Sequence, residues 1–505
     1  MKQIRSFFLL VILVLFFTEP LFAQLSSIAQ KENEVLSVMH SISSHDLYNT
    51  IKELTSDKYY GRLTGTEGYN AAAEWLAGEF EECGIKPYGD NDTYYQWFDI
   101  PYILVFEGCE TYLHIPVKDG EIQKHYKYVS EFIPGSTSGS GEITAEVVYA
   151  GYGITAPELD YDDYKGINVK GEIILIECEA PVSDRKDPEL FKKWRPYSFH
   201  QYKLKNAVEH GTKGMLYNYG PISNPNNAYD PGFIYSHVGD TVVSDLFAGT
   251  GKNHKETVEK IQKKLKPQSF ETGKTVTIKN YTEYHPEGKG SNVIGLIEGS
   301  DPELKNEVII LGAHLDHLGR CYEIMPGAND NASGIAVLLE VAKALAKSPV
   351  ALKRSVLFLA FGAEEQSIIG SKFYLEHPRF PLEKTVCLIN MDGVGAGNKL
   401  NALAGENYPE IWKPIDQANQ QYIHQSVRPT NFPNLARPRL DAARFMWAGV
   451  PSISFSAYGT RSPYHVPHDN LEIITPEIME DLAQLLFLAI IEIANTNRPI
   501  PPPPE

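Results

Sequence analysis

Imidazole and carboxylate side chains recur in five short motifs in the second half of the chain. The residues are His314 and Asp316 in HLD, Asp330 in GANDNASG, Glu364 and Glu365 in GAEEQ, Asp392 in INMDG, and His465 in YHVPHDN. Zinc binds imidazole nitrogen and carboxylate oxygen readily, and a catalytic zinc site keeps one position open for water or substrate. The set therefore indicates a hydrolase that uses two metal ions.

Each residue also has a structural explanation when it is taken alone. His314 could be a hydrogen-bonded core histidine, and Asp330 could cap the helix that follows it. Taken together, the residues follow or lie beyond apolar runs typical of buried strands, namely EVIILGA (307–313), SVLFLAF (355–361), TVCLIN (385–390) and GVPSISF (449–455). Open α/β sheets bind ligands just beyond the carboxyl ends of their strands. The runs therefore predict one shared site at one sheet edge.

Helices are expected to flank these strands. Residues 69–83 carry apolar side chains at helical spacing, 335–348 follow the Asp330 motif, and 477–494 form an amphipathic pattern. Asp330 would then lie near a helix N-terminus, where the helix dipole favours negative charge. A further strand is expected at 291–299. The predicted fold class is α/β, with a mixed central sheet flanked by helices.

The motifs HxD, NDNASG, GAEE, NMD and YHxPxD, with GRLTGTEGY at 61–69, resemble those of a known family. They are similar to the secreted bacterial co-catalytic di-zinc aminopeptidases of the leucyl-aminopeptidase type, whose relatives include glutamate carboxypeptidase and the transferrin receptor. The resemblance spans most of the chain beyond its first residues. It implies the zinc exopeptidase fold and two Zn²⁺ ions as cofactors.

The resemblance also assigns the metal ligands. It implies that His314 and Glu365 hold one zinc ion, that Asp392 and His465 hold the other, and that Asp330 bridges both. Two zinc ions bring about +4 and three carboxylates remove about 3, which leaves a charge near +1 that suits a bound hydroxide. A hydroxide bridging the two ions would attack the peptide bond.

Three further residues near the ligand motifs have secondary roles. Asp316 would orient the ring of His314, because a metal-bound imidazole usually donates its other N–H to a carboxylate that fixes the orientation of the ring. His317 and His468 each stand three residues after a ligand histidine, and the family pattern favours the first of each pair. Both are expected to be hydrogen-bonded loop residues or part of the pocket wall.

Two residues are candidates for catalysis itself. Glu364 neighbours a ligand, so it could take a proton from the attacking water and pass it to the leaving amine as a general base. Tyr464 could donate a hydrogen bond to the developing oxyanion, although a tyrosine packed against the pocket wall is almost as plausible. Arg439 and Asp441 are candidates for the pocket wall, with an ordinary surface pair as the alternative.

The predicted domain organisation interrupts the catalytic domain. From about 111 to 284 the chain is rich in tyrosine, glycine and short β runs, in an order that resembles the protease-associated domain found inserted in many family members. Its role could be that of a structural lid or of a substrate-shaping module. The predicted segments are a signal peptide (1–23), the first part of the catalytic domain (24–110), the insert (111–284), the second part of the catalytic domain (285–498) and a proline-rich tail (499–505).

Export and partners follow from the composition and the N-terminal segment. Lys2 and Arg5 precede the apolar run at 7–17, and a small residue, Ala23, stands at the expected cleavage point, which predicts an exported protein in the periplasm or outside the cell, with no membrane span after cleavage. The formal net charge of −18 argues against nucleic-acid partners. Five cysteines leave at least one unpaired, and sequence does not decide the oligomeric state.

The predicted function is a metallo-aminopeptidase whose substrates are peptides with a free N-terminus. A carboxypeptidase stays open because Arg461, near the YH motif, could grip a free carboxylate. A one-zinc glutaminyl cyclase shares the fold and much of the ligand set. A non-catalytic receptor-like binding protein would be expected to have lost ligands, and this chain carries all five.

Overall fold

The structure is a computed structural model that describes residues 30–225, 228–432 and 440–496. The predicted signal peptide (1–23), Arg439 and the proline-rich tail (499–505) lie outside the described residues. Among the helices of the described part, none is long and apolar enough to cross a membrane. All five cysteines are described, and all five are free thiols.

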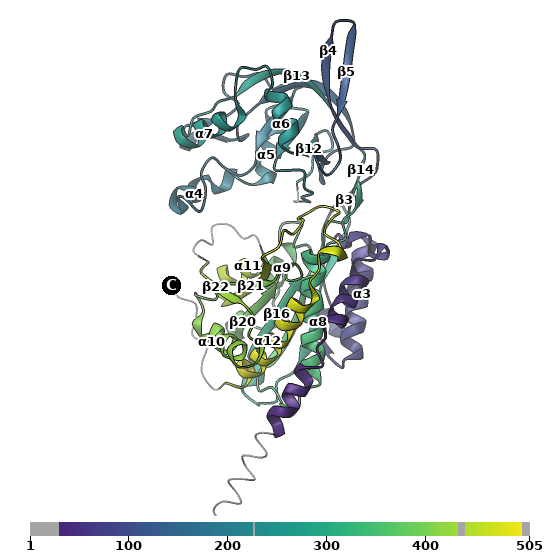
Figure 1. Cartoon of the computed structure of the whole chain (residues 1–505), viewed down its shortest axis with the longest axis vertical. Coiled ribbons are helices and arrows are strands. Elements are labelled where there is room, and N and C mark those ends of the chain that lie inside the picture. The colour runs from purple at the N-terminus through teal and green to yellow at the C-terminus, as the bar shows by residue number, and fades with distance from the viewer. Residues whose placement is uncertain (1–29, 226–227, 433–439, 497–505) are drawn as a thin grey trace, which may run out of the picture.

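A nine-stranded mixed sheet forms the larger part of the molecule (Figure 1). Its main path runs in the order β1-β15-β19-β16-β20-β23-β21-β22, and β2 also pairs with β15. The strands are β1 (Lys86–Pro87), β2 (Tyr95–Asp99), β15 (Lys289–Ile297), β16 (Val308–His314), β19 (Ser355–Phe361), β20 (Thr385–Met391), β21 (Lys399–Leu403), β22 (Val427–Thr430) and β23 (Ser452–Tyr458). The neighbours β19, β16, β20 and β23 are parallel, so their carboxyl ends meet at one edge.

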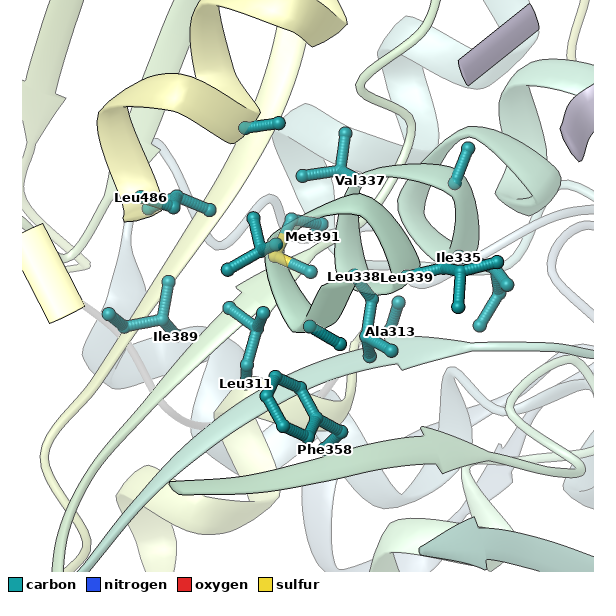
Figure 2. Close-up of a cluster of buried hydrophobic side chains, with 14 of the residues drawn as sticks. Leu311, Ala313, Ile335, Val337, Leu338, Leu339, Phe358, Ile389, Met391 and Leu486 are labelled. Carbon is teal, nitrogen blue, oxygen red and sulfur yellow. The ribbon is translucent and has the colours of Figure 1, made fainter. Parts of the chain in front are cut away.

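Helices cover both faces of this sheet. They are α2 (Ser44–Leu54), α3 (Glu67–Glu82), α8 (Ser333–Ala346), α9 (Ile369–Glu376), α10 (Pro409–Ala418), α11 (Asp441–Trp447) and α12 (Pro476–Asn495). The core between the sheet and helices α8 and α12 includes Leu311, Phe358, Ile389 and Leu486, whose side chains lie around α8 in Figure 2. The alternate strand residues face α9 and α11. Because successive strand side chains point to opposite faces, uninterrupted apolar runs mark strands that are buried on both faces.

The structure confirms the predicted α/β class and most of the predicted elements. The runs at 307–313, 355–361 and 385–390 become β16, β19 and β20, and the three predicted helices become α3, α8 and α12. The last predicted strand begins three residues late, at Ser452 in β23. Asp330 itself lies ahead of α8, in a turn with non-helical backbone angles.

A second, eight-stranded sheet is built from residues between 110 and 280. Its strands are β4 (Glu110–Val117), β5 (Gly120–His125), β6 (Phe132–Pro134), β7 (Gly141–Tyr149), β10 (Ile173–Glu177), β11 (Gly214–Asn218), β12 (Ile234–Val238) and β13 (Phe270–Asn280). The helices of this part are α4 (Pro188–Trp194), α5 (His200–Glu209), α6 (Asp240–Phe247) and α7 (His254–Lys264). This part, here called the insert, forms the upper lobe in Figure 1. Its identification with a protease-associated domain stays a prediction.

Short strands lie where the chain passes between the two lobes. The strands of a four-stranded sheet there are β3 (Tyr102–Val105), β14 (Thr282–His285), β17 (Arg320–Cys321) and β18 (Glu323–Ile324). A separate pair, β8 (Thr155–Ala156) with β9 (Tyr161–Asp162), lies within the insert. Because β3 and β14 pair antiparallel, the entry to the insert and the exit from it lie side by side (Figure 1).

Candidate metal centre

Asp330 lies at the centre of a buried cluster at the carboxyl edge of the parallel strands. Its Oδ1 is 3.2 Å from Nε2 of His314, which is itself 3.6 Å from Oδ1 of Asp392. Its Oδ2 is 3.4 Å from Nε2 of His465, which is itself 3.0 Å from Oε2 of Glu365. The five residues that the sequence singled out as metal ligands therefore converge, with Asp330 shared between two groups.

The pairing of these residues differs from the one that the resemblance implied. His314 was expected beside Glu365, and Asp392 beside His465. The distances instead associate His314 with Asp392, and Glu365 with His465. Both β19 and β20 neighbour β16, so the register and the length of the turn decide: Asp392 directly follows β20 beside His314, whereas Glu365 stands four residues beyond the end of β19.

Two polar side chains fix the loop that carries Asp330. The amide group of Asn331 donates to the carbonyl of Met391 at 2.9 Å and accepts from the N–H groups of Gly334 and Gly393 at 3.0 and 3.2 Å. The carboxylate of Asp469 accepts from the N–H groups of Asn329 and Asp330 at 2.8 and 3.0 Å. The Asp330 loop is thereby connected to the loops of Asp392 and His465.

Asp316 is fully buried and connects His314 to the glutamate pair. Its carbonyl lies 3.1 Å from Nδ1 of His314, and its carboxylate oxygen lies further away, at 3.6 Å. The carboxylate accepts from the N–H groups of Glu364 and Glu365 at 3.1 and 3.2 Å. The Nδ1 of His314 therefore has a backbone partner, and Nε2 is directed at the cluster; such an outer hydrogen bond orients the ring of a metal-bound histidine.

The two neighbouring histidines differ from each other. His468 is exposed. His317 is fully buried, and its Nδ1 lies 3.0 Å from Oε1 of Glu365. Together with Asp330 and Glu365, His317 forms a second group of close donor atoms that could hold a metal ion. The second metal position thus has two imidazoles within reach.

The carboxylates of the cluster stabilise positive charge in their midst. Burial favours neutral imidazole at His465, but the nearby Glu365 and Asp330 outweigh it and raise the pKa of His465 to about 10. Burial also opposes the charged form of Glu365, yet His465 and His317 lower the pKa of this carboxyl to about 2. In the metal-free protein, His465 thus carries a positive charge where a metal cation would otherwise lie. The donor set of nitrogen and carboxylate oxygen fits divalent metals such as zinc.

A pocket of about 340 Å³ opens beside the cluster, between the central sheet and the insert. Glu364, Glu365 and Tyr464 line it together with Arg195 and Tyr219 of the insert. The ring of Tyr464 stacks on His465 with centroids 3.7 Å apart. Burial raises the pKa of Glu364 well above its usual value. A proton acceptor and a phenol therefore face the same space.

The other sequence candidates lie elsewhere. Asp441 is fully buried beneath the cluster rather than exposed, and burial raises its pKa to about 7. Arg461 is exposed. Arg444 stands three residues after Asp441 in α11 and lines the pocket. The sequence did not single it out.

Arg62 is a site-supporting residue whose role the sequence analysis missed. It is fully buried, and its guanidinium donates to the carbonyls of Leu315, Leu54, Pro326 and Gly327 at 2.7–2.9 Å. It thereby connects α2 to the loops that carry His314 and Asp330. The available signal was its place in the GRLTGTEGY motif, but the partners are distant in the chain.

The fold and the cluster define an α/β protein with a carboxylate and histidine centre suited to divalent metals. Residues 292–490 match the model of Peptidase family M28.

Comparison with known proteins extends the match. Aminopeptidase YwaD of Bacillus subtilis (strain 168) is 27% identical over 221 residues, which are 41% of this chain and 45% of that protein. Leupeptin-inactivating enzyme 1 of Streptomyces exfoliatus is 29% identical over 217 residues, with the same shares. The matched segment is thus less than half the length of each of these relatives.

The solved structures show that the fold is shared over nearly the whole chain. The aminopeptidase from Aneurinibacillus sp. strain AM-1 aligns with a TM-score of 0.63 at 22% identity and covers 93% of this chain and 98% of its own. BSAP, a zinc aminopeptidase from Bacillus subtilis, aligns with a TM-score of 0.61 at 21% identity and covers 90% and 97%. The expected zinc exopeptidase fold is confirmed.

Proposed function

We propose that this chain is a zinc-dependent aminopeptidase that hydrolyses the N-terminal peptide bond of peptides outside the cytoplasm. The observation that carries the proposal is the position of Asp330, whose two oxygens face two separate groups of ligating atoms. The match of residues 292–490 to a peptidase family model and the names of the similar proteins support the reaction class. Two zinc ions would be held by His314 with Asp392 and by Glu365 with His465, and Asp330 would contact both.

When bound, zinc would acidify the attacking water and polarise the scissile carbonyl. The protein's own contribution begins with Glu364, which lies next to a ligand but is not among the close donor groups around Asp330. Its carboxylate accepts the proton of the attacking water and then delivers it to the leaving amine. The N–H of Glu364 is held by Asp316, so the residue that positions the His314 loop also positions the base.

The pocket accounts for the rest of the substrate contacts. Glu364 and Asp392 provide negative charge for a free α-amino group, which favours cleavage from the amino end. Tyr464 reaches the pocket and donates a hydrogen bond to the oxyanion that develops on the carbonyl oxygen. The aromatic side chains of Phe199 and Tyr219 from the insert also line the pocket.

A carboxypeptidase is the second candidate, because two arginines line the same pocket. Arg444 donates to the carbonyl of Ser367 at 3.2 Å, and Arg195 lies 3.7 Å above the ring of Phe199. Either guanidinium could pair with a substrate carboxylate. The two candidates differ in which end of the peptide must be free.

One set of assays separates these functions. Purified protein is analysed for zinc, and hydrolysis is followed for a dipeptide in free, N-acetylated and C-amidated forms. An aminopeptidase cleaves the free and the C-amidated forms and leaves the N-acetylated form intact. Cleavage of the N-acetylated form with loss of activity on the amide would instead establish a carboxypeptidase, and no cleavage of any form would overturn both.

The variant Glu364→Gln tests the general base. We expect it to keep its zinc and to lose about 10²–10⁴-fold in kcat, the usual contribution of general acid–base catalysis. Glu376→Gln is the matched control, because it makes the same chemical change at an exposed glutamate at the end of α9, outside the metal centre. Near-normal turnover of Glu364→Gln would exclude the assigned role.

A further inference from the structure

The two candidate ligand histidines are held in different ways. The Nδ1 of His314 faces the carbonyl of Asp316, two residues further along the same loop, at 3.1 Å. The Nδ1 of His465 donates to the carbonyl of Ser223, which belongs to the insert and lies 242 positions earlier in the chain, at 2.8 Å. One ring is therefore positioned locally, and the other by the second lobe.

The contact between His465 and the insert is reciprocal. The N–H of Ser223 donates to the carbonyl of His465 at 2.9 Å, so the two residues exchange two hydrogen bonds. Ser223 is fully buried, and His465 is only 5% exposed. Water therefore does not compete with this pair of bonds.

A buried serine fixes the segment 221–225, which carries Ser223. The hydroxyl of Ser136, just beyond β6, lies 2.7 Å from the hydroxyl of Ser223 and accepts from the N–H of Asn224 at 3.0 Å. β6 is in turn paired with β12 in the sheet of the insert. The acceptor for His465 is thus anchored to the insert's own framework.

The chemistry of the acceptor determines the state of the ring. A carbonyl oxygen only accepts, so Nδ1 of His465 must carry a hydrogen, and the lone pair of the neutral imidazole must be on Nε2. Nε2 is the atom that faces Asp330 and Glu365, at 3.4 and 3.0 Å. Outer partners of this kind typically change metal affinity by about 10–100-fold when they are lost.

We propose that the insert is a working part of the metal centre. The segment 221–225 is a positioning element that fixes the orientation and tautomer of His465, and it sets the affinity of the metal position formed by His465 and Glu365 while leaving the position formed by His314 and Asp392 unaffected. The inference rests on the metal-binding role proposed above for His465.

Zinc titration of the metal-free protein against a chromogenic chelator tests this proposal. The variants are Ser136→Ala, which removes the anchor of the segment, and Ser223→Pro, which removes the N–H that donates to His465. We expect each to weaken one zinc equivalent by about 10–100-fold and to leave the other unchanged. His465→Ala serves as the reference for complete loss of that equivalent.

Thr272→Val is the matched control. Thr272 is buried in the insert and donates one hydroxyl bond to the carbonyl of Val147 at 2.6 Å, so its loss reports a general effect on the insert. Thermal unfolding of all variants in the metal-free form shows whether they are folded, and Ser136→Ala provides the milder change should Ser223→Pro not fold.

The outcomes separate the two proposals. Wild-type protein that binds no zinc, or His465→Ala that binds zinc like the wild type, overturns the proposed function and this inference with it. Zinc binding by Ser136→Ala and Ser223→Pro equal to that of Thr272→Val overturns this inference alone. Equal weakening of both equivalents also overturns it, because a specific role requires that only one position changes.

Discussion

Replacing Arg62 by methionine should damage both the stability and the metal site. Methionine fills a similar apolar volume but removes the donors that satisfy four carbonyls, at 2.7–2.9 Å. It also removes the positive charge that lies among Asp469, Asp316, Asp330 and Glu365. The loop that carries His314 and the loop that carries Asp330 would lose their shared support.

The magnitude follows from two opposing effects. A hydrogen bond to a charged group contributes about 1.5–3 kcal/mol net. Burial lowers the pKa of Arg62 to about 10, which corresponds to about 3 kcal/mol against the charged form. Subtracting this cost from the contribution of the four hydrogen bonds predicts that Arg62→Met lowers the free energy of unfolding by about 3–9 kcal/mol. A folded domain is usually stable by only about 5–15 kcal/mol, so the loss is a large part of the total.

Urea unfolding of the metal-free protein and zinc titration measure the two effects. Arg354→Met is the control, because Arg354 is also buried and bonded, to Glu307 at 2.8 Å and to the carbonyl of Ile493 at 3.2 Å. It lies at the amino end of β19, opposite the metal centre. Both variants should lose stability, but only Arg62→Met should weaken zinc binding by the folded protein. A loss under about 1 kcal/mol for Arg62→Met, or equal zinc affinity in the two variants, would refute this reasoning.

Three further changes have clear expected outcomes. Glu365→Ala should lose at least one zinc equivalent in elemental analysis, because it removes a ligand and leaves Asp330 as the remaining carboxylate beside His465 and His317. Gly334→Ala should lower the midpoint of thermal unfolding and the zinc affinity, because a Cβ there would lie 2.5 Å from Oδ1 of Asn331; an overpacked core site costs about 1–3 kcal/mol. His200→Phe should remove one cause of acid sensitivity. Burial lowers the pKa of His200 to about 4, so between pH 6.5 and about 4 the unfolded chain takes up a proton that the folded protein does not. The free energy of unfolding of the wild type should therefore fall by up to about 3 kcal/mol over this range, and that of the variant should lack this fall. Urea unfolding across this range should show that the free energy of unfolding of the variant rises relative to that of the wild type as pH falls. The same pH dependence in both proteins would contradict this assignment.

The sequence was sufficient for the elements and for the identity of the clustered residues. Apolar runs of seven or so residues that end in acids or histidines predicted β16, β19 and β20, because strands buried on both faces have no polar alternation. The motifs then placed Asp330 and His465 in the loops that meet those strand ends. Local pattern contains this information because each run and each turn is specified by neighbouring residues.

The partition of the cluster could not be read from the sequence. β16 lies between β19 and β20, so which carboxylate lies beside His314 depends on the register of these strands and on how far the turn after each strand carries its acid from the sheet edge. The order of residues along the chain gives neither the register of the strands nor the path of these turns. The expected pairing of His314 with Glu365 therefore gave way to a pairing with Asp392.

Two residues that support the site, Arg62 and Ser223, were decided by the tertiary structure alone. Arg62 donates to a carbonyl 253 positions away, and Ser223 accepts from a ring 242 positions away. Both contacts involve backbone carbonyls, which every residue has, so no residue type in the sequence marks them. Folding selects these partners because a buried polar group must find a hydrogen bond wherever the packed chain brings one within reach.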